Sequence, residues 1–476
     1  MDTGSVRPAV TELRLSAFKT HRGITLPLGP LTLLSGGSGS GKSSALQAYE
    51  ILARLGSGES LARAVRDVAG SASACVPAGA RPDEEGRRGF RIGCTVDGPA
   101  GPVHLDLAVQ AEPELRIVGE RLTGGGETLL TTALTDPARP AVQAAWHTAG
   151  ASPVTRAPLP DDRLGTSLLP LRVAGKTEGQ RLVLAAAEQV VVALRSAFVC
   201  DPRPEVMRGT RAAMAAGAVC GGGTGRAKKA GTGKAAGKAA ATATTPGSRG
   251  ARARKGGGDG GGAGGWGRGA DDMPDEGRLR TSCDNLPAVL ERTSKECTRR
   301  HAVLVAAVRE ACAGPVDGLR AVPRQPDATA ERAAAAPSPA APAGGGRSGS
   351  GAQRAGQGAA VEEPRLQAVV DRGTLGAMPI EQLGDGELRF LALALVLLTG
   401  PGVLAMDPAG EIPSAQQQMT VMADGMDRCM DHRQARELVS LAVRMAERGH
   451  VRLLGTVRDP SVADGLPGVQ VLHLGA

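Results

Sequence analysis

Aromatic side chains are scarce in this chain of 476 residues, which contains four phenylalanines, two tryptophans and one tyrosine. A surface that binds single-stranded nucleic acid by stacking the bases on aromatic rings is therefore not expected. The eight cysteines are scattered and form no Cys-x-x-Cys pair, which argues against a disulfide framework. The hydrophobic core must be built mainly from Leu, Val, Ala and Ile.

Segments typical of membrane or secreted proteins are also lacking. The longest uninterrupted apolar run, residues 390–398, is less than half of the ~20 residues that a membrane helix needs. The first residues do not combine a basic stretch with an apolar one, so no signal peptide is predicted. We therefore expect a soluble, cytoplasmic protein with reduced cysteines and no membrane contact.

Glycine, proline and positive charge are concentrated in two segments. Residues 221–270 consist mainly of Gly, Ala, Thr, Lys and Arg, and Asp259 is their single acidic residue. This segment carries a net charge of +9 and the whole chain +8, so the rest of the chain sums to −1. A contact with DNA or another polyanion would therefore be made in this segment. Residues 325–358 are rich in Pro, Ala and Gly. Neither segment can bury enough apolar surface to fold, so both are predicted to be disordered linkers.

The two linkers separate three blocks that we expect to be ordered. Strands and helices alternate in residues 10–220 and 361–476, which predicts an α/β fold. The short block 281–324 is expected to contain a helical segment and a strand. The predicted strands are 10–18, 31–35, 90–96, 103–110, 114–120, 403–406, 451–457 and 469–474, of which the three between 90 and 120 form a β-meander. The predicted helices are 43–55, 177–199, 284–314, 387–398 and 431–448.

A glycine-rich loop connects predicted strand 31–35 to predicted helix 43–55. Its sequence, GGSGSGKS over residues 36–43, matches G-x-x-x-x-G-K-[ST] in the strand–loop–helix setting that a phosphate-binding loop requires. Glycines allow successive backbone N–H groups to face an anion, and the helix start adds the positive end of its dipole. The alternative is a chance match in a glycine-rich chain.

The loop predicts binding of ATP together with Mg²⁺. The ammonium group of Lys42 would reach the β- and γ-phosphates, which also makes it a candidate catalytic residue, and the hydroxyl of Ser43 would bind the metal. The predicted nucleotide-binding residues in this region are Gly36, Gly37, Ser38, Gly39, Ser40, Gly41, Lys42, Ser43 and Ser44.

Residues 10–55 resemble the start of RecF/SMC-type ATPases of the ABC superfamily, including RecF-like ATP-binding proteins of the AAA-family type. The resemblance implies a P-loop NTPase fold, an ABC-type ATPase head with a mixed sheet, and a homodimer that forms when ATP is bound. The remaining landmarks of such a head would lie in residues 378–460, after a long insertion.

These landmarks depart from the family pattern, first at the signature and after the Walker B strand. Residues 383–387, LGDGE, resemble the LSGGE-type signature, which implies that Gly386 contacts a phosphate, but Gly384 replaces the signature serine. Residues 403–407, VLAMD, resemble the Walker B strand, which implies that Asp407 holds Mg²⁺ through water. Pro408 replaces the glutamate that would follow. The alternatives are a glycine-rich helix cap and an Asp-Pro turn.

Three further residues are interpreted through the same resemblance. Arg458 aligns with the switch histidine, where it could neutralise γ-phosphate charge. Glu411 is the carboxylate near Asp407 that could act as the base if its loop folds back. Asp431 resembles part of the loop that contacts the other subunit. His21 has no partner at an identifiable spacing and is given no role.

Three functions are compatible with these features. The first is a RecF/SMC-like ATPase with weak hydrolysis that acts through ATP-dependent dimerisation. The second is a nucleotide-binding switch or scaffold without hydrolysis, in which ATP orders a dimer interface. The third is a nucleic-acid-binding protein that uses the basic linker. Pro408 and Arg458 favour the second over the first, and the near-neutral remainder of the chain disfavours the third.

Deleting either predicted linker should leave the stability of the protein unchanged. Removal of residues 221–270 or 325–358 is expected to shift the melting temperature by no more than ~2 °C, because their composition offers no core contacts to lose. Thermal denaturation of the full chain and of each deletion variant tests this. A fall of many degrees would show that the deleted segment is packed.

Overall fold

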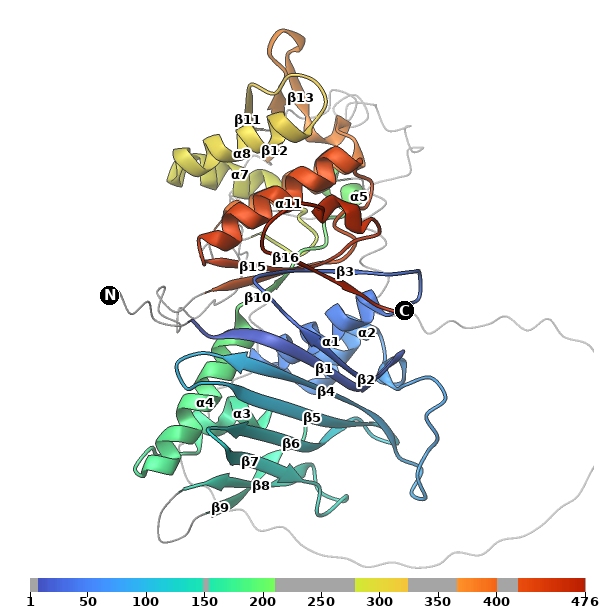
Figure 1. The fold of residues 1–476 in the computed structure, drawn as a ribbon, viewed down its shortest axis with the longest axis vertical. Helices are drawn as coiled ribbons and strands as arrows, with labels where there is room; N and C mark the ends of the chain where they lie inside the picture. Colours follow the sequence, from blue (N-terminus) through green and yellow to red (C-terminus); the bar gives the residue numbers. More distant parts are fainter. Residues whose placement is uncertain (1–6, 149–153, 210–278, 324–365, 400–417, 476) are drawn as a thin grey trace, which may run out of the picture. The chain divides into compact units, whose positions relative to one another are not determined.

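The computed structural model describes residues 7–148, 154–209, 279–323, 366–399 and 418–475 (Figure 1). All of these residues belong to one compact unit of the chain. They form three sheets of eight, five and three strands. Two of the sheets and the helices between them determine where the glycine-rich loop lies.

The eight-stranded sheet is antiparallel and has the order β2-β1-β4-β5-β6-β7-β8-β9. Its strands are β1 (Ala9–Phe18), β2 (His21–Pro27), β4 (Arg88–Asp97), β5 (Val103–Glu112), β6 (Arg116–Gly124), β7 (Glu127–Ala133), β8 (Ala141–His147) and β9 (Val154–Pro160). Successive side chains point to opposite faces, so Phe90 and Ile92 of β4 enter the core while Arg91 is exposed. One face of the sheet is therefore apolar and must be covered.

Two helices cover that face. Tyr49 of α1 (Lys42–Gly56) and Val183 of α4 (Glu178–Arg195) belong to the same apolar cluster as the buried residues of β4 and β5. The shorter helices of this region are α2 (Leu61–Ala69) and α3 (Gly165–Leu168), with 3₁₀ turns at Ser73–Cys75 and Leu169–Leu171. Helix α5 (Pro204–Met207) lies outside this region, and its Met207 belongs to a second apolar cluster. Packing on the sheet thus fixes the axis of α1, the helix that follows the glycine-rich loop.

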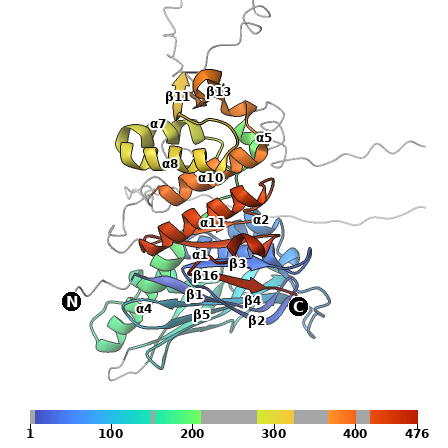
Figure 2. The same ribbon diagram turned by 45° about the horizontal axis from the view of Figure 1, so that its top comes forward.

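The five-stranded sheet is parallel and has the order β10-β14-β15-β3-β16. Its strands are β3 (Leu31–Ser35), β10 (Ala197–Val199), β14 (Met419–Ala423), β15 (Val451–Thr456) and β16 (Val469–His473). The pleat sends Leu33 toward one apolar cluster and Leu34 toward the other, so both faces are buried. Helix α11 (His432–Glu447) lies between α10 (Asp385–Leu398) and this sheet (Figure 2).

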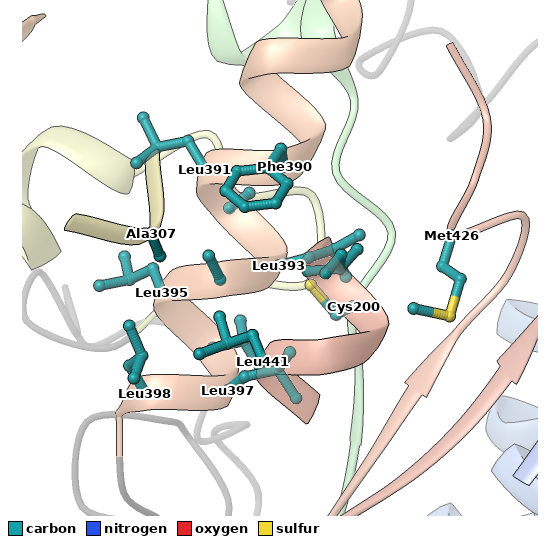
Figure 3. Packing of buried hydrophobic residues seen from close by; sticks show 14 of the residues in the cluster. Cys200, Ala307, Phe390, Leu391, Leu393, Leu395, Leu397, Leu398, Met426 and Leu441 are labelled. Carbon is teal, nitrogen blue, oxygen red and sulfur yellow. The ribbon is translucent and has the colours of Figure 1, made fainter. Parts of the chain in front are cut away.

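The three-stranded sheet is antiparallel and adjoins helices α7 (Leu286–Glu296) and α8 (Thr298–Ala311). Its strands are β11 (Gly318–Pro323), β12 (Leu366–Asp371) and β13 (Ala377–Pro379), and the remaining 3₁₀ turns are Gly373–Leu375, Ile380–Gln382 and Pro460–Ala463. Helix α10 packs against α8 and α11 and is buried from Leu388 to Leu398 (Figure 3).

Most of the predicted elements are confirmed, and three predictions need correction. The helix predicted over 177–199 ends at Arg195, and its last residues form the short parallel strand β10. The helix predicted over 284–314 is two helices, because Cys297 adopts a non-helical conformation (φ −149°, ψ 80°) between them. The meander continues through β7, β8 and β9, which were not predicted.

The structure leaves other predictions untested. The strand predicted at 403–406 and both predicted linkers fall outside the described residues. Within the described ranges, every helix is too short or too polar to cross a bilayer.

Candidate nucleotide-binding site

The glycine-rich loop occupies the connection between β3 and α1, as its sequence predicts. Gly36, Gly39 and Gly41 have φ angles of 141°, 84° and 94°, which L-residues with a side chain rarely adopt. A Cβ on Gly36 would lie 2.3 Å from the carbonyl oxygen of Leu474. At Gly37 and Gly39 no atom lies within 4 Å of such a Cβ. The loop is therefore closely packed where it leaves β3 and open along its middle.

The turn between β1 and β2 supports the other end of the loop. The His21 ring is buried, and its Nε2 lies 3.0 Å from the carbonyl oxygen of Gly41. A Cβ on Gly41 would approach that ring to 2.4 Å. His21, which the sequence analysis gave no role, therefore fixes where α1 begins. Its partner is distant in the sequence, so no local spacing could have indicated this contact.

Helix α1 presents unoccupied backbone donors to the loop. Its N-cap is Gly41, which makes no side-chain cap, and no acidic residue lies in its first turn. The first N–H groups of a helix lack partners within the helix, and they carry the positive end of its dipole. Ser43 and Ser44 lie in this first turn, with Ser43 exposed. This arrangement is suited to an anion such as a phosphate.

Lys42 lies across the loop. Its Nζ donates to the carbonyl oxygens of Gly36 (2.7 Å) and Gly37 (2.9 Å) and lies 3.5 Å from Oγ of Ser40. The ammonium group is thus held at the loop by oxygen acceptors of the loop itself. Phosphate oxygens entering the loop would replace acceptors of the same kind.

A carboxylate lies at the same edge of the parallel sheet. Asp424 directly follows β14, and Ala423 pairs with Gly455 of β15, which pairs with Leu33 of β3. Carboxyl ends of parallel strands share one edge, and two strand spacings of about 4.8 Å separate β14 from β3. Asp424 is exposed. The sheet therefore brings this carboxylate to the edge from which the loop emerges.

The carboxylate of Asp424 is oriented by Thr456, the last residue of β15. The Thr456 hydroxyl donates to Oδ1 of Asp424 (2.6 Å) and accepts from the backbone N–H of Gly425 (2.7 Å). Thr456 at the end of the neighbouring strand thus fixes both the side chain of Asp424 and the peptide group that follows it.

Asp424 is the residue that sequence reasoning missed. Asp407 and Glu411 lie in residues 400–417, outside the described residues. The sequence pattern of an apolar run before an aspartate was recognised at residues 403–407, whereas the similar run Met419–Ala423, which precedes Asp424, was not predicted as a strand. The pairing of Met419–Ala423 with β15 identifies this run as a strand of the parallel sheet, and such pairing depends on contacts between segments that are distant in the sequence.

The switch-like turn after β15 is also held in place. Backbone N–H groups of Arg458 (2.7 Å) and Asp459 (3.0 Å) donate to Oδ2 of Asp427, which is buried. Val457 N–H donates to the carbonyl oxygen of Leu34 on the strand that leads into the loop (2.9 Å). The side chain of Arg458 is exposed. Its backbone is therefore fixed beside β3 while its guanidinium remains accessible.

The signature-like turn starts helix α10. Gly384 is the N-cap, and Glu387 accepts from its backbone N–H (3.3 Å) and from Nη2 of Arg372 (3.0 Å). Gly386 is buried, and a Cβ there would lie 2.2 Å from the carbonyl oxygen of Cys429. Within this chain Gly386 therefore packs against the segment after β14.

Two acidic side chains lie at the starts of the neighbouring helices α10 and α11. Asp385, in the first turn of α10, pairs with Arg208 (2.5 Å). Asp431 is the N-cap of α11 and accepts from the backbone N–H of Gln434 (2.7 Å). Both carboxylates have partners within the chain.

Neither a protein-family model nor a curated protein matches the chain. Among solved structures, it is similar to an Smc head bound to the C-winged helix domain of ScpA, with 11% identity, a TM-score of 0.41 and coverage of 96% of this chain and 91% of that one.

Two further SMC heads are similar at comparable levels. The Smc head with an extended coiled coil bound to the C-terminal domain of ScpA, derived from Pyrococcus furiosus, has 8% identity and a TM-score of 0.39, with 96% and 91% of the two chains covered. The SMC head domain from Thermotoga maritima has 10% identity and a TM-score of 0.36, with 97% and 94% covered. At TM-scores this low, the similarity does not by itself establish a common fold, and the candidate site stands on its own geometry.

The packing at the start of α10 generates a test with an internal control. Gly386→Ala should lower the free energy of unfolding by about 1–3 kcal/mol, because the added methyl group meets a backbone carbonyl that cannot rotate away. Gly384→Ala, two residues earlier, meets no atom within 4 Å and should change stability by less than ~1 kcal/mol. Urea denaturation of both variants measures the difference, and equal effects would contradict the packing described.

Proposed function

We propose that the chain binds ATP with Mg²⁺ through the loop at residues 36–43 and belongs, as its sequence resemblance implies, to the RecF/SMC-like ATPases. The observation that carries the proposal is the joint placement of three features at one edge of the parallel sheet. These features are the open glycine loop, the uncapped start of α1 and the oriented carboxylate of Asp424.

Different groups of the chain would bind the phosphates and the metal ion. Backbone N–H groups of the loop and of the first turn of α1 would bind the phosphates, and Lys42 would contribute a mobile positive charge. Ser43 and Asp424 would hold Mg²⁺, since both supply the hard oxygen ligands that this ion prefers. When bound, the metal would neutralise part of the phosphate charge.

Asp424 takes the metal role that the sequence analysis gave to Asp407. Two facts support this choice: the described parallel sheet already has a strand, β14, in the position required, and Thr456 orients the carboxylate at its end. Asp407 remains an alternative metal ligand on the basis of its sequence pattern alone, because it lies outside the described residues.

Hydrolysis is expected to be slow. An attacking water needs a base or hydrogen-bond acceptor, which contributes typically ~10²–10⁴ in rate. Gly425 follows Asp424 and Pro408 follows Asp407, so neither aspartate is followed by a base. Arg458 can neutralise phosphate charge but is a poor proton acceptor. These replacements support nucleotide binding with weak turnover.

Dimer formation with ATP belongs to the same proposal. Gly384 at the start of α10 is exposed, and no atom lies within 4 Å of the position of a Cβ there, so the signature-like turn is accessible to a second copy of the chain. The switch or scaffold function without hydrolysis remains the second candidate, supported by Gly425 and Gly384. Contact of the basic segment 221–270 with DNA or another polyanion remains a prediction from composition.

Replacing Lys42 tests nucleotide binding directly. Lys42→Ala should weaken ATP binding at least about tenfold, because a charge-assisted contact contributes ~1.5–3 kcal/mol. Calorimetric titration with ATP and Mg²⁺ measures the affinity. Lys295→Ala is the matched control, since it removes the same charge from the exposed surface of α7. Unchanged affinity in Lys42→Ala would refute the proposed site.

Replacing Glu411 separates the two candidate functions. If Glu411 is the base, Glu411→Gln should reduce phosphate release by ~10²-fold or more while ATP affinity stays unchanged. Phosphate release under saturating ATP and Mg²⁺ measures turnover. Brisk hydrolysis in both forms would contradict the expectation of a weak enzyme. Bound ATP without measurable hydrolysis in either form would favour the switch function.

A further inference from the structure

Helix α10 contains a buried positive charge among apolar residues. Arg389 lies between Leu388 and Phe390, and its side chain is 3% exposed. Arginine is almost never fully buried unless it is paired. The surrounding side chains on this helix include Leu391 and Leu393, which pack in the core (Figure 3). A charge placed here needs a structural or functional reason.

The guanidinium group of Arg389 binds backbone oxygens of two separate segments. Its Nη1 donates to the carbonyl oxygen of Pro202 (2.6 Å), and Oδ1 of Asp201 lies 4.0 Å away. Its Nη2 donates to the carbonyl oxygens of Gly425 (3.0 Å) and Asp424 (3.3 Å). Arg389 thus connects α10 to the residues after β10 and to the turn after β14.

The turn at Asp424 is therefore held on both sides. On one side, Thr456 binds the carboxylate of Asp424 and the N–H of Gly425. On the other side, Arg389 binds the carbonyl oxygens of the same two residues. With both peptides fixed, the carboxylate can point in only a narrow range of directions, which is the requirement for a metal ligand.

We propose that Arg389 is a positioning residue that orients Asp424 for Mg²⁺. The inference rests on the proposed function, because it assumes that Asp424 faces the metal of bound Mg–ATP. The inference predicts a specific change in ATP binding. Loss of Arg389 should remove the part of the ATP affinity that depends on Mg²⁺ and leave the part that the glycine-rich loop contributes.

A second buried arginine provides a matched control. Arg452 at the start of β15 donates to the carbonyl oxygens of Leu28 (2.7 Å), Gly29 (3.0 Å) and Val10 (3.3 Å). It is buried and also binds three carbonyl groups, but Leu28 and Gly29 precede β3, at the amino edge of the parallel sheet. Its loss should destabilise the protein without affecting Asp424.

The experiment measures ATP affinity of the full chain by calorimetry, once in excess Mg²⁺ and once in excess EDTA. The ratio of the two dissociation constants is the metal contribution, expected to be about tenfold or more in the unmodified protein. Arg389→Met and Asp424→Asn should each bring the ratio close to one, with the EDTA affinity changed less than about threefold. Arg452→Met should retain the ratio, and Arg389→Lys, which keeps a charged donor, should recover part of it.

Each outcome decides one part of the inference. A normal ratio in Arg389→Met, with the ratio lost in Asp424→Asn, overturns the role of Arg389 and leaves the proposed function intact. A normal ratio in Asp424→Asn overturns the metal role itself. If Arg452→Met also brings the ratio close to one, loss of the Mg²⁺ contribution is a general effect of destabilisation, and the inference about Arg389 is wrong. If Arg389→Met does not fold, Arg389→Gln, which keeps one donor group, is measured by the same criterion.

Discussion

Parallel pairing of β14, β15 and β3 is the constraint on which the candidate site depends. These strands bring Asp424, Thr456 and the glycine-rich loop to one edge of a sheet, although they come from opposite ends of the chain. Because both faces of the sheet are buried, a one-residue shift in register would move the side chains of a strand into the opposite apolar cluster and disrupt the packing of both clusters. The core therefore maintains the spacing between the loop and the carboxylate.

Buried polar groups then fix the loops that the sheet brings together. His21 supports the end of the glycine loop, Asp427 holds the turn that carries Arg458, and Arg389 holds the turn at Asp424. Each of these groups binds backbone atoms of a loop. Each therefore determines where that loop lies and leaves the side chains of the loop free for other contacts. A buried polar group left without its partner is strongly unfavourable, which makes these contacts selective for one loop conformation.

The proposed site has the groups expected for phosphate binding and lacks some of those expected for hydrolysis. The loop, Lys42 and the start of α1 are arranged as phosphate binding requires. The position after Asp424 is a glycine, and the signature-like turn has Gly384 where the resemblance implies a serine. The proposed site therefore contains more of the groups expected for nucleotide binding than of those expected for hydrolysis.

The sequence by itself determined the local features. The glycine-rich loop, the strand before it and the helix after it follow from short patterns in which each residue acts through its neighbours. Helix α10 and the alternation of β4 were readable for the same reason. Only the tertiary structure showed that Asp424 lies at the edge of the sheet from which the loop emerges, because this placement depends on the pairing of β14 with β15 and of β15 with β3. The roles of His21 and Arg389 were likewise decided there, since their partners lie 20 and about 35 residues away and no local spacing records such contacts.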